Sequence, residues 1–279
     1  MHRVNRWACV VSLALAACGG RSAVTGTVEE FAMHSAAVGD DYRILVRLPP
    51  GYATDLAKRF PIVFQLDATV FGPEFDTMSE QASQLEEEGK IPEVIVVGVG
   101  WPYDGAALGE RGRWRDFCLE YGDGTPAGAN AFLQFLREEL LPKVDANYRT
   151  DPSRGRALSG HSLGGYFSLY TMLETGLETD PPFTRFIAGD PSISNDDWTL
   201  LSESEALSAR TTSLPRSLYL LIARYDGAAQ RIDFDELTSR LEAHYPDLRL
   251  GTHVEPTDHG GAIAPSFRNE LEFVFGGGR

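Results

Sequence analysis

Short apolar runs recur along the chain, separated by segments in which apolar residues return every three or four positions. The runs at 61–66 (PIVFQL) and 94–99 (VIVVGV) are continuous, which is typical of strands buried on both faces of a sheet. Residues 41–48 alternate in the manner of a half-buried strand, and the turn-forming Pro49-Pro50-Gly51 follows them. Further strands are expected at 156–159, 185–188, 218–223 and 249–255.

Helical patterns occupy much of the chain between these runs. Residues 163–173 form an apolar helical stretch, and 233–244 carry apolar residues at three- and four-residue spacing. Another stripe consists of Phe132, Leu133, Phe135, Leu136, Leu140 and Leu141. Strands that alternate with helices predict an α/β fold, with a mostly parallel central sheet and helices on both faces. Residues 101–125 follow neither pattern, so we expect a long loop there.

The N-terminus has the features of an export signal. His2, Arg3 and Arg6 give the first residues a positive charge, and 7–17 is an apolar run too short to span a bilayer. Small residues lead to a cysteine in Leu15-Ala16-Ala17-Cys18, which resembles the lipobox of bacterial lipoproteins. That resemblance implies cleavage before Cys18 and a lipid on its sulfur. The alternative is an ordinary signal with an incidental cysteine.

These features divide the chain into three parts. We expect a lipoprotein-type signal peptide at 1–17, a small polar tether at 18–27, and a single α/β-hydrolase catalytic domain at 28–279. The mature protein would be exported and anchored to the membrane through Cys18, on the periplasmic or cell-surface side.

Composition and charge narrow the class of protein. Of the 279 residues, 43% are hydrophobic and 23% are charged, as in a globular domain with a sizeable core. The formal net charge of −15 makes nucleic acids and anionic membrane surfaces poor partners. Cys9 and Cys18 belong to the signal and the lipobox, so Cys118 is left without a disulfide partner. We interpret Cys118 as a small apolar core residue.

The segment Gly160-His161-Ser162-Leu163-Gly164 matches the G-x-S-x-G pattern of a nucleophilic serine. A strand is expected before it and a helix after it, so the motif lies on the strand–turn–helix that the pattern requires. The residues two before and two after the serine approach each other in such a turn, so both must be small. A helix that begins at Leu163 would point its N-terminus at the site, where the Leu163 N–H can stabilise an oxyanion.

The serine hydroxyl needs a base, and three histidines follow Ser162 in the chain. His244 falls in a helical pattern and His253 within the last expected strand. His259 lies in the loop after that strand, at the sheet edge to which Ser162 also belongs. We therefore predict His259 as the general base.

The acid of such a triad lies between the serine and the histidine in the chain. Asp226 follows the strand at 218–223 and is the expected acid. Asp190 follows the preceding strand and is the alternative.

Several further motifs resemble the esterase family that includes esterase D, siderophore esterases, feruloyl esterases and the mycolyltransferases. The resemblance runs from about residue 42 to the C-terminus, and among the branches it is greatest to the siderophore esterases. It is carried by Leu48-Pro49-Pro50-Gly51-Tyr52, Gln65-Leu66-Asp67, Val97-Gly98-Val99-Gly100, Arg115-Asp116-Phe117, Leu141-Pro142, Tyr148-Arg149-Thr150-Asp151, Ser159 to Gly165, Asp190-Pro191-Ser192 and His259-Gly260.

The resemblance implies an α/β-hydrolase fold that works without a metal or an organic cofactor. It places Asp226 at the acid position of the family and implies the backbone N–H of Ala68 as the second oxyanion donor. The implied activity is hydrolysis of a siderophore-like or other small carboxylic ester through an acyl-enzyme. Two alternatives stay open: an acyltransferase of the mycolyltransferase type, and a non-catalytic lipoprotein that binds a ligand.

Three arginines, Arg111, Arg113 and Arg115, fall in the expected loop at 101–125. They would either steer an anionic substrate or serve the structure, for example through an Arg115–Asp116 contact.

Overall fold

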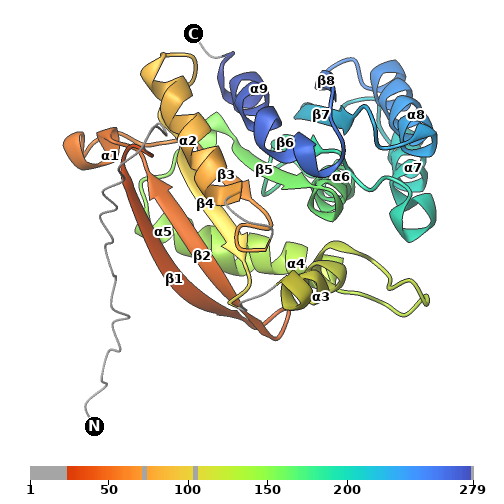
Figure 1. Cartoon of the computed structure of the whole chain (residues 1–279), viewed down its shortest axis with the longest axis horizontal. Helices are drawn as coiled ribbons and strands as arrows, with labels where there is room; N and C mark the ends of the chain where they lie inside the picture. The colour runs from red at the N-terminus through yellow and green to blue at the C-terminus, as the bar shows by residue number, and fades with distance from the viewer. Residues whose placement is uncertain (1–23, 71–73, 103–105, 278–279) are drawn as a thin grey trace.

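The structure, a computed structural model, describes residues 24–70, 74–102 and 106–277 (Figure 1). An eight-stranded sheet runs through it in the order β1-β2-β4-β3-β5-β6-β7-β8. The first two neighbour pairs, β1 with β2 and β2 with β4, are antiparallel, and all other neighbours are parallel. The strands are β1 (Thr27–Ser35), β2 (Asp40–Leu48), β3 (Ile62–Gln65), β4 (Ile95–Gly100), β5 (Arg156–His161), β6 (Arg185–Gly189), β7 (Ser217–Ala223) and β8 (Arg249–Glu255).

Helices connect the strands. They are α1 (Gly51–Thr54), α2 (Glu74–Glu87), α3 (Ala106–Phe117), α4 (Ala129–Gln134), α5 (Leu141–Asn147), α6 (Leu163–Glu174), α7 (Asn195–Ser208), α8 (Ala228–His244) and α9 (Ile263–Phe275). The π-helix η1 (Phe135–Leu140) joins α4 to α5, and η2 (Pro152–Arg154) and η3 (Gly260–Ala262) are short 3-10 turns. In the part of the chain that is described, no helix has the length and apolar character needed to cross a membrane.

The sheet separates two apolar cores because its strands are buried on both faces. In β3, Ile62 and Phe64 face one core, and Val63, between them, faces the other. The helices α2 and α9 lie side by side over the face of Val63 (Figure 1). The other face packs against α4, α5 and α6. The predicted α/β architecture is therefore confirmed, and the predicted strands agree with the observed ones to within two residues at each end.

One prediction about local structure is wrong. Residues 101–125 were expected to form a loop, but they contain α3, which carries two glycines. A Cβ on Gly112 would lie 2.6 Å from the indole of Trp101, so the close packing of α3 on Trp101 requires glycine there. Tertiary packing thus overrides the low helix propensity of this segment. Cys118, just after α3, is buried and free, as expected.

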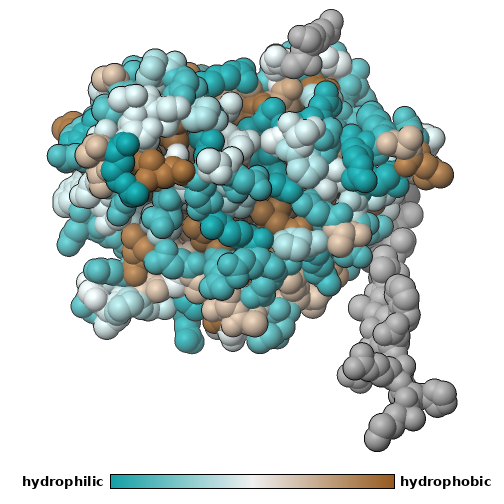
Figure 2. All heavy atoms as spheres, turned by 180° about the vertical axis from the view of Figure 1, so that it is seen from behind, coloured by the Kyte–Doolittle hydropathy of each residue, from teal (hydrophilic) through white to brown (hydrophobic). Residues whose placement is uncertain are grey.

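The predicted signal peptide at 1–17 and most of the tether at 18–27 lie outside the described residues. The first strand begins at Thr27. Hydrophilic residues cover most of the face seen in Figure 2, and apolar residues form small separate groups on it.

Four neighbouring parallel strands, β5 to β8, end at one edge of the sheet. Ser162, Asp190, Asp226 and His259 follow these strands in that order. Residues from distant parts of the chain thus come together where ligands of parallel α/β sheets bind.

Candidate active site

Ser162 forms the sharp turn between β5 and α6. Its backbone has φ 59° and ψ −119°, a conformation that residues with a side chain rarely adopt. A Cβ on Gly160 would overlap the backbone of Gly164, so the close approach that the G-x-S-x-G pattern requires is present. The Ser162 N–H donates to the carbonyl of Gly189 at 2.9 Å, which fixes the turn against the end of β6.

The two expected oxyanion donors, the N–H groups of Leu163 and Ala68, differ in whether they already have an acceptor. Leu163 is the first residue of α6, so its N–H has no acceptor within the helix and is placed at the positive end of the helix dipole. The N–H of Ala68 instead donates to the carbonyl of Val99 at 3.1 Å. The Ala68 N–H is engaged in this way because the chain just after β3 continues to pair with β4. Its role as an oxyanion donor stays a prediction.

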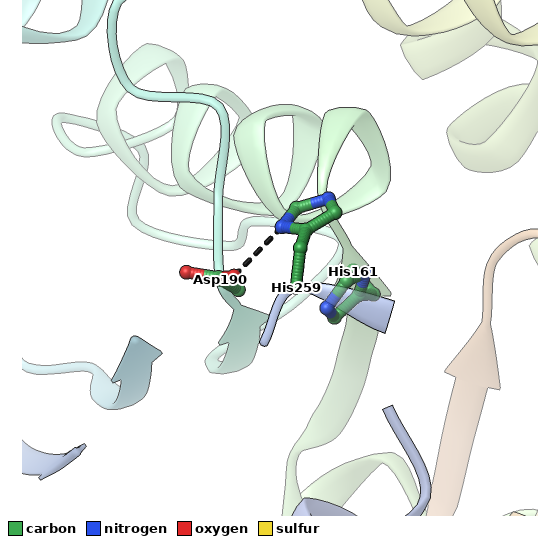
Figure 3. Close-up of side chains that lie close together, drawn as sticks. All are labelled: His161, Asp190 and His259. Atoms are coloured by element: carbon green, nitrogen blue, oxygen red, sulfur yellow. Dashed lines mark hydrogen bonds and ion pairs between the residues drawn. The ribbon is translucent and has the colours of Figure 1, made fainter. Parts of the chain in front are cut away.

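His259 lies between β8 and η3 and has two carboxylates beside the same ring nitrogen. Its Nδ1 lies 2.7 Å from Oδ2 of Asp190, the contact drawn in Figure 3, and 3.3 Å from Oδ2 of Asp226. The structure thus brings both candidate acids to His259. The shorter contact is the one to Asp190, the alternative, and not to Asp226, the expected acid.

The two carboxylates are held differently. Asp190 is fully buried, and its Oδ1 accepts the N–H of Ala223, the last residue of β7, at 3.0 Å. Both of its oxygens therefore have a donor. Asp226 lies in the turn after β7, and its side chain is 22% exposed. The N–H of Tyr225 in that turn donates to the carbonyl of Thr257 at 3.1 Å, which holds the turn near His259.

These contacts shift the pKa values of His259 and Asp226. The hydrogen bond to Asp190 raises the pKa of His259, burial opposes this, and the charges of Asp190 and Asp226 add to it. The pKa of Asp226 is also raised, first by its partial burial and then by the nearby charge of Asp190. The single N–H at Nδ1 of His259 can make only one well-aligned hydrogen bond. The shorter contact assigns this bond to Asp190, and Asp226 lies on the solvent side of the ring.

His161 packs against the His259 ring, with 4.7 Å between the ring centroids. Burial, followed by the charge of His259, lowers the pKa of His161 to about 3, so it is neutral near pH 7. Potential metal-binding atoms of His161, Asp190 and His259 lie within 4.8 Å of one another (Figure 3). A metal ion bound to His259 Nδ1 and Asp190 Oδ2 would replace the hydrogen bond between these two atoms.

Sequence reasoning gave no role to Ser192, which lies next to the nucleophile. Its Oγ is 3.5 Å from the Oγ of Ser162, and its N–H donates to the Ser162 carbonyl at 3.2 Å. No hydrogen bond joins the Ser162 and His259 side chains in the described part of the chain. Catalytic hydrogen bonds are often long in ligand-free sites and tighten when substrate binds.

The three arginines of α3 differ in burial and in the partners they contact. Arg113 is buried, and its guanidinium donates to Oδ1 of Asp67 at 2.9 Å and to the carbonyl of His161 at 3.4 Å. It thereby joins the segment after β3 to the residue before the nucleophile. Arg115 pairs with Asp116 at 2.6 Å, so the structural alternative holds for both residues. Arg111 is exposed.

Comparison with known proteins identifies the family of this chain. Residues 35–177, just over half of the chain, match the family model described as "Putative esterase". The chain belongs to this family. Its membership agrees with the resemblance seen in the sequence motifs.

Named relatives of this esterase-family protein act on siderophores. It is 33% identical over 178 residues to ferri-bacillibactin esterase BesA of Bacillus subtilis, a match that covers 59% of this chain and 58% of the relative. It is 32% identical over 177 residues to the siderophore triacetylfusarinine C esterase of Aspergillus fumigatus, covering 60% of this chain and 57% of that protein. The chain thus spans less than two thirds of the length of these curated relatives.

Solved structures with the same fold cover nearly the whole chain. The BES protein from Bacillus cereus superposes with a TM-score of 0.75 at 24% identity, covering 94% of this chain and 99% of that one. Siderophore hydrolase EstB from Aspergillus nidulans gives a TM-score of 0.75 at 21% identity, covering 94% and 98%. The α/β-hydrolase fold expected from the sequence is confirmed.

Proposed function

We propose that this protein is a serine ester hydrolase, with Ser162 as nucleophile and His259 as general base. The proposal is carried by two features of one sheet edge: the strained turn of Ser162 at the end of β5, and a carboxylate-bound histidine in the loop after β8. Membership of the esterase family supports it, as do the names of the relatives.

The proton positions follow from the hydrogen bonds. Carboxylates only accept hydrogen bonds, so Nδ1 of His259, which faces Asp190 and Asp226, carries a hydrogen. Nε2 then keeps its lone pair and can take a proton. In the proposed reaction it takes the proton of the Ser162 hydroxyl as the oxygen attacks the ester carbonyl.

The remaining steps release the two products. The Leu163 N–H stabilises the oxyanion of the tetrahedral intermediate, and protonated His259 returns its proton to the leaving alcohol. Water, activated by the same histidine, then attacks the acyl-enzyme and releases the carboxylic acid. The N–H of Ala68 has no part in this scheme while it donates to Val99.

In the proposed site the acid of the triad is a pair. Asp226 stands at the position that the order of strands assigns to the acid, whereas Asp190 is buried and makes the shorter contact to His259. We assign to Asp190 the role of orienting the imidazole. Asp226 then contributes its charge from the solvent side.

The proposed substrate is a siderophore-like or other small carboxylic ester, by extension from the named activities of the relatives. We also propose that the mature protein is attached to a membrane through Cys18 and works on the periplasmic or cell-surface side. The motif that supports this, Leu15 to Cys18, lies outside the described residues.

Ester turnover by defined variants tests the proposal. The purified protein should hydrolyse a small activated ester such as p-nitrophenyl butyrate, and a panel of siderophore esters would define the acyl and alcohol parts. Ser162→Ala and His259→Ala should each abolish most turnover, and the double variant should lose little more, because the two residues act as a unit.

His244→Ala provides the matched control, because His244 ends α8 and bonds the carbonyl of Thr211. It should keep wild-type turnover. Full turnover by Ser162→Ala would disprove the proposed nucleophile. Product analysis with added glycerol separates hydrolysis from acyl transfer, since a transferase would form the glycerol ester.

A further inference from the structure

A second candidate site lies far from Ser162, at the sheet edge where the parallel strands begin. A hollow of about 150 Å³ is lined there by Arg154, Arg185 and Arg249, together with the end of α9. We call it the arginine hollow. Arg154 ends η2 just before β5, and the other two are the first residues of β6 and β8. Parallel strands start at one edge, so the fold gathers these three cations.

Within the residues that the structure describes, the arginine hollow lacks the opposite charge that such a cluster normally has. In the described residues, no ion pair joins any of the three arginines to a carboxylate. Burial lowers the pKa of Arg185, and the positive charges of Arg249 and Arg154 lower it further. In a chain of net charge −15, three arginines at one hollow without an ion pair to any described carboxylate call for a physical explanation.

Structural contacts explain only part of this arrangement. Arg185 donates to the carbonyl of Val274 in the last turn of α9, and the guanidinium of Arg249 lies 4.2 Å from the ring centroid of Phe273. These contacts fix the two guanidinium groups at the C-terminal end of the helix. The dipole there corresponds to about half a negative charge, against three full positive charges. Among the described residues, an excess of positive charge therefore remains at the hollow.

We propose that the arginine hollow binds a small multivalent oxyanion of the phosphate class, held by Arg154, Arg185 and Arg249. Guanidinium groups bind phosphate oxygens in pairs through their planar N–H donors, and contacts among the described residues leave most of these donors available. The volume of about 150 Å³ is smaller than the roughly 300–1,000 Å³ of pockets for drug-sized ligands, so it suits a single phosphate group. That group could belong to free phosphate or to a lipid headgroup.

Calorimetric titration of the full chain with inorganic phosphate, at constant ionic strength set with chloride, tests the proposal. We expect saturable binding and a rise of about 2–4 °C in the unfolding midpoint near saturation. The double variant Arg154→Gln, Arg249→Gln should weaken phosphate binding at least tenfold. Both side chains are exposed, so this variant should fold, whereas Arg185→Gln also loses the contact to Val274.

The matched control is Arg210→Gln, which removes an exposed arginine away from the hollow and should bind phosphate as the wild type does. Cosedimentation with phosphatidylglycerol vesicles distinguishes the two sources. Binding to vesicles that phosphate displaces would indicate a lipid headgroup, and phosphate binding alone would indicate the free ion. The proposal is overturned if phosphate does not bind saturably, or if the double variant and the wild type bind it equally.

Discussion

Exchange of Asp190 for asparagine should cost far more turnover than the same exchange at Asp226. Asp190 uses both oxygens, one for His259 Nδ1 at 2.7 Å and one for the N–H of Ala223 at 3.0 Å. Asparagine has one accepting oxygen, so its NH₂ group would face one of these two donors. Either the ring of His259 or the end of β7 then loses its acceptor in a fully buried position.

The size of the loss follows from the role of the residue. Exchange of a triad aspartate for asparagine lowers kcat by about 10⁴ when the imidazole adopts the wrong tautomer. We expect a loss of about 10³–10⁴ for Asp190→Asn. The contact of Asp190 to the His259 ring is as short as in a triad. Asp226 stays close enough, however, to orient the imidazole in part of the variant molecules.

Asp226→Asn should act mainly on pH dependence. Its Oδ2 lies 3.3 Å from His259 Nδ1, beyond the usual length of a strong hydrogen bond, and the side chain is 22% exposed. Two charges about 4 Å apart in water interact by about 1 kcal/mol, which corresponds to less than one pH unit. Loss of this negative charge should lower the pKa of His259. The acid limb of kcat/KM should therefore move to lower pH by less than about one unit, with kcat within about tenfold of wild type.

The assay is the pH profile of kcat and kcat/KM for a small activated ester, with Asp235→Asn as the control for lost surface charge. Asp235 lies on α8 and pairs with Arg231. Unfolding midpoints show whether each variant is folded. If Asp226→Asn lost about 10³-fold or more in kcat and Asp190→Asn stayed within about tenfold, our assignment would be refuted and Asp226 would be the orienting acid.

Three further predictions concern pH, packing and location. Because the pKa of His259 is raised, the acid limb of the wild-type kcat/KM profile should lie above about pH 6.5, and a limb well below that value would contradict the described contacts. Gly160→Ala should reduce the free energy of unfolding by about 1–3 kcal/mol in denaturant titration and also reduce turnover, because its Cβ would overlap Gly164. Gly122→Ala is its control and should change neither quantity, since a Cβ there meets nothing within 4 Å. Cys18→Ala should release the protein from the membrane fraction or block its processing; unchanged fractionation and mass would count against the lipid anchor.

The parallel part of the sheet could be predicted because its strands alternate with helical patterns, and the runs at 61–66 and 94–99 are continuously apolar. The edge strand β1 was not predicted, because most of its residues are partly or fully exposed and its apolar signal is weak. The helix α3 was missed because its two glycines oppose helix formation when read locally, although packing requires Gly112 beside Trp101 and Gly109 beside Val70.

The part of the candidate site that depends on the order of strands along the chain could be predicted. Ser162 and His259 follow strands whose carboxyl ends meet at one edge, so their proximity follows from the topology. The choice between Asp190 and Asp226 depends on a difference of 0.6 Å between contacts of 2.7 and 3.3 Å, and on a backbone φ of 39° at Asp190. Sequence order carries no information on either quantity. Sequence order likewise carries no information on the hydrogen bond from Ala68 to Val99, since that pairing depends on where β3 stops following β4.

Covalent labelling with a fluorophosphonate, followed by peptide mass mapping, tests the proposed nucleophile most directly. The reagent reacts with a serine that a neighbouring base activates. We predict a single modification, on the peptide that contains Ser162, which is absent in Ser162→Ala and strongly slowed in His259→Ala. Absence of labelling in the folded wild-type protein, or a modification elsewhere that persists in Ser162→Ala, would contradict the account.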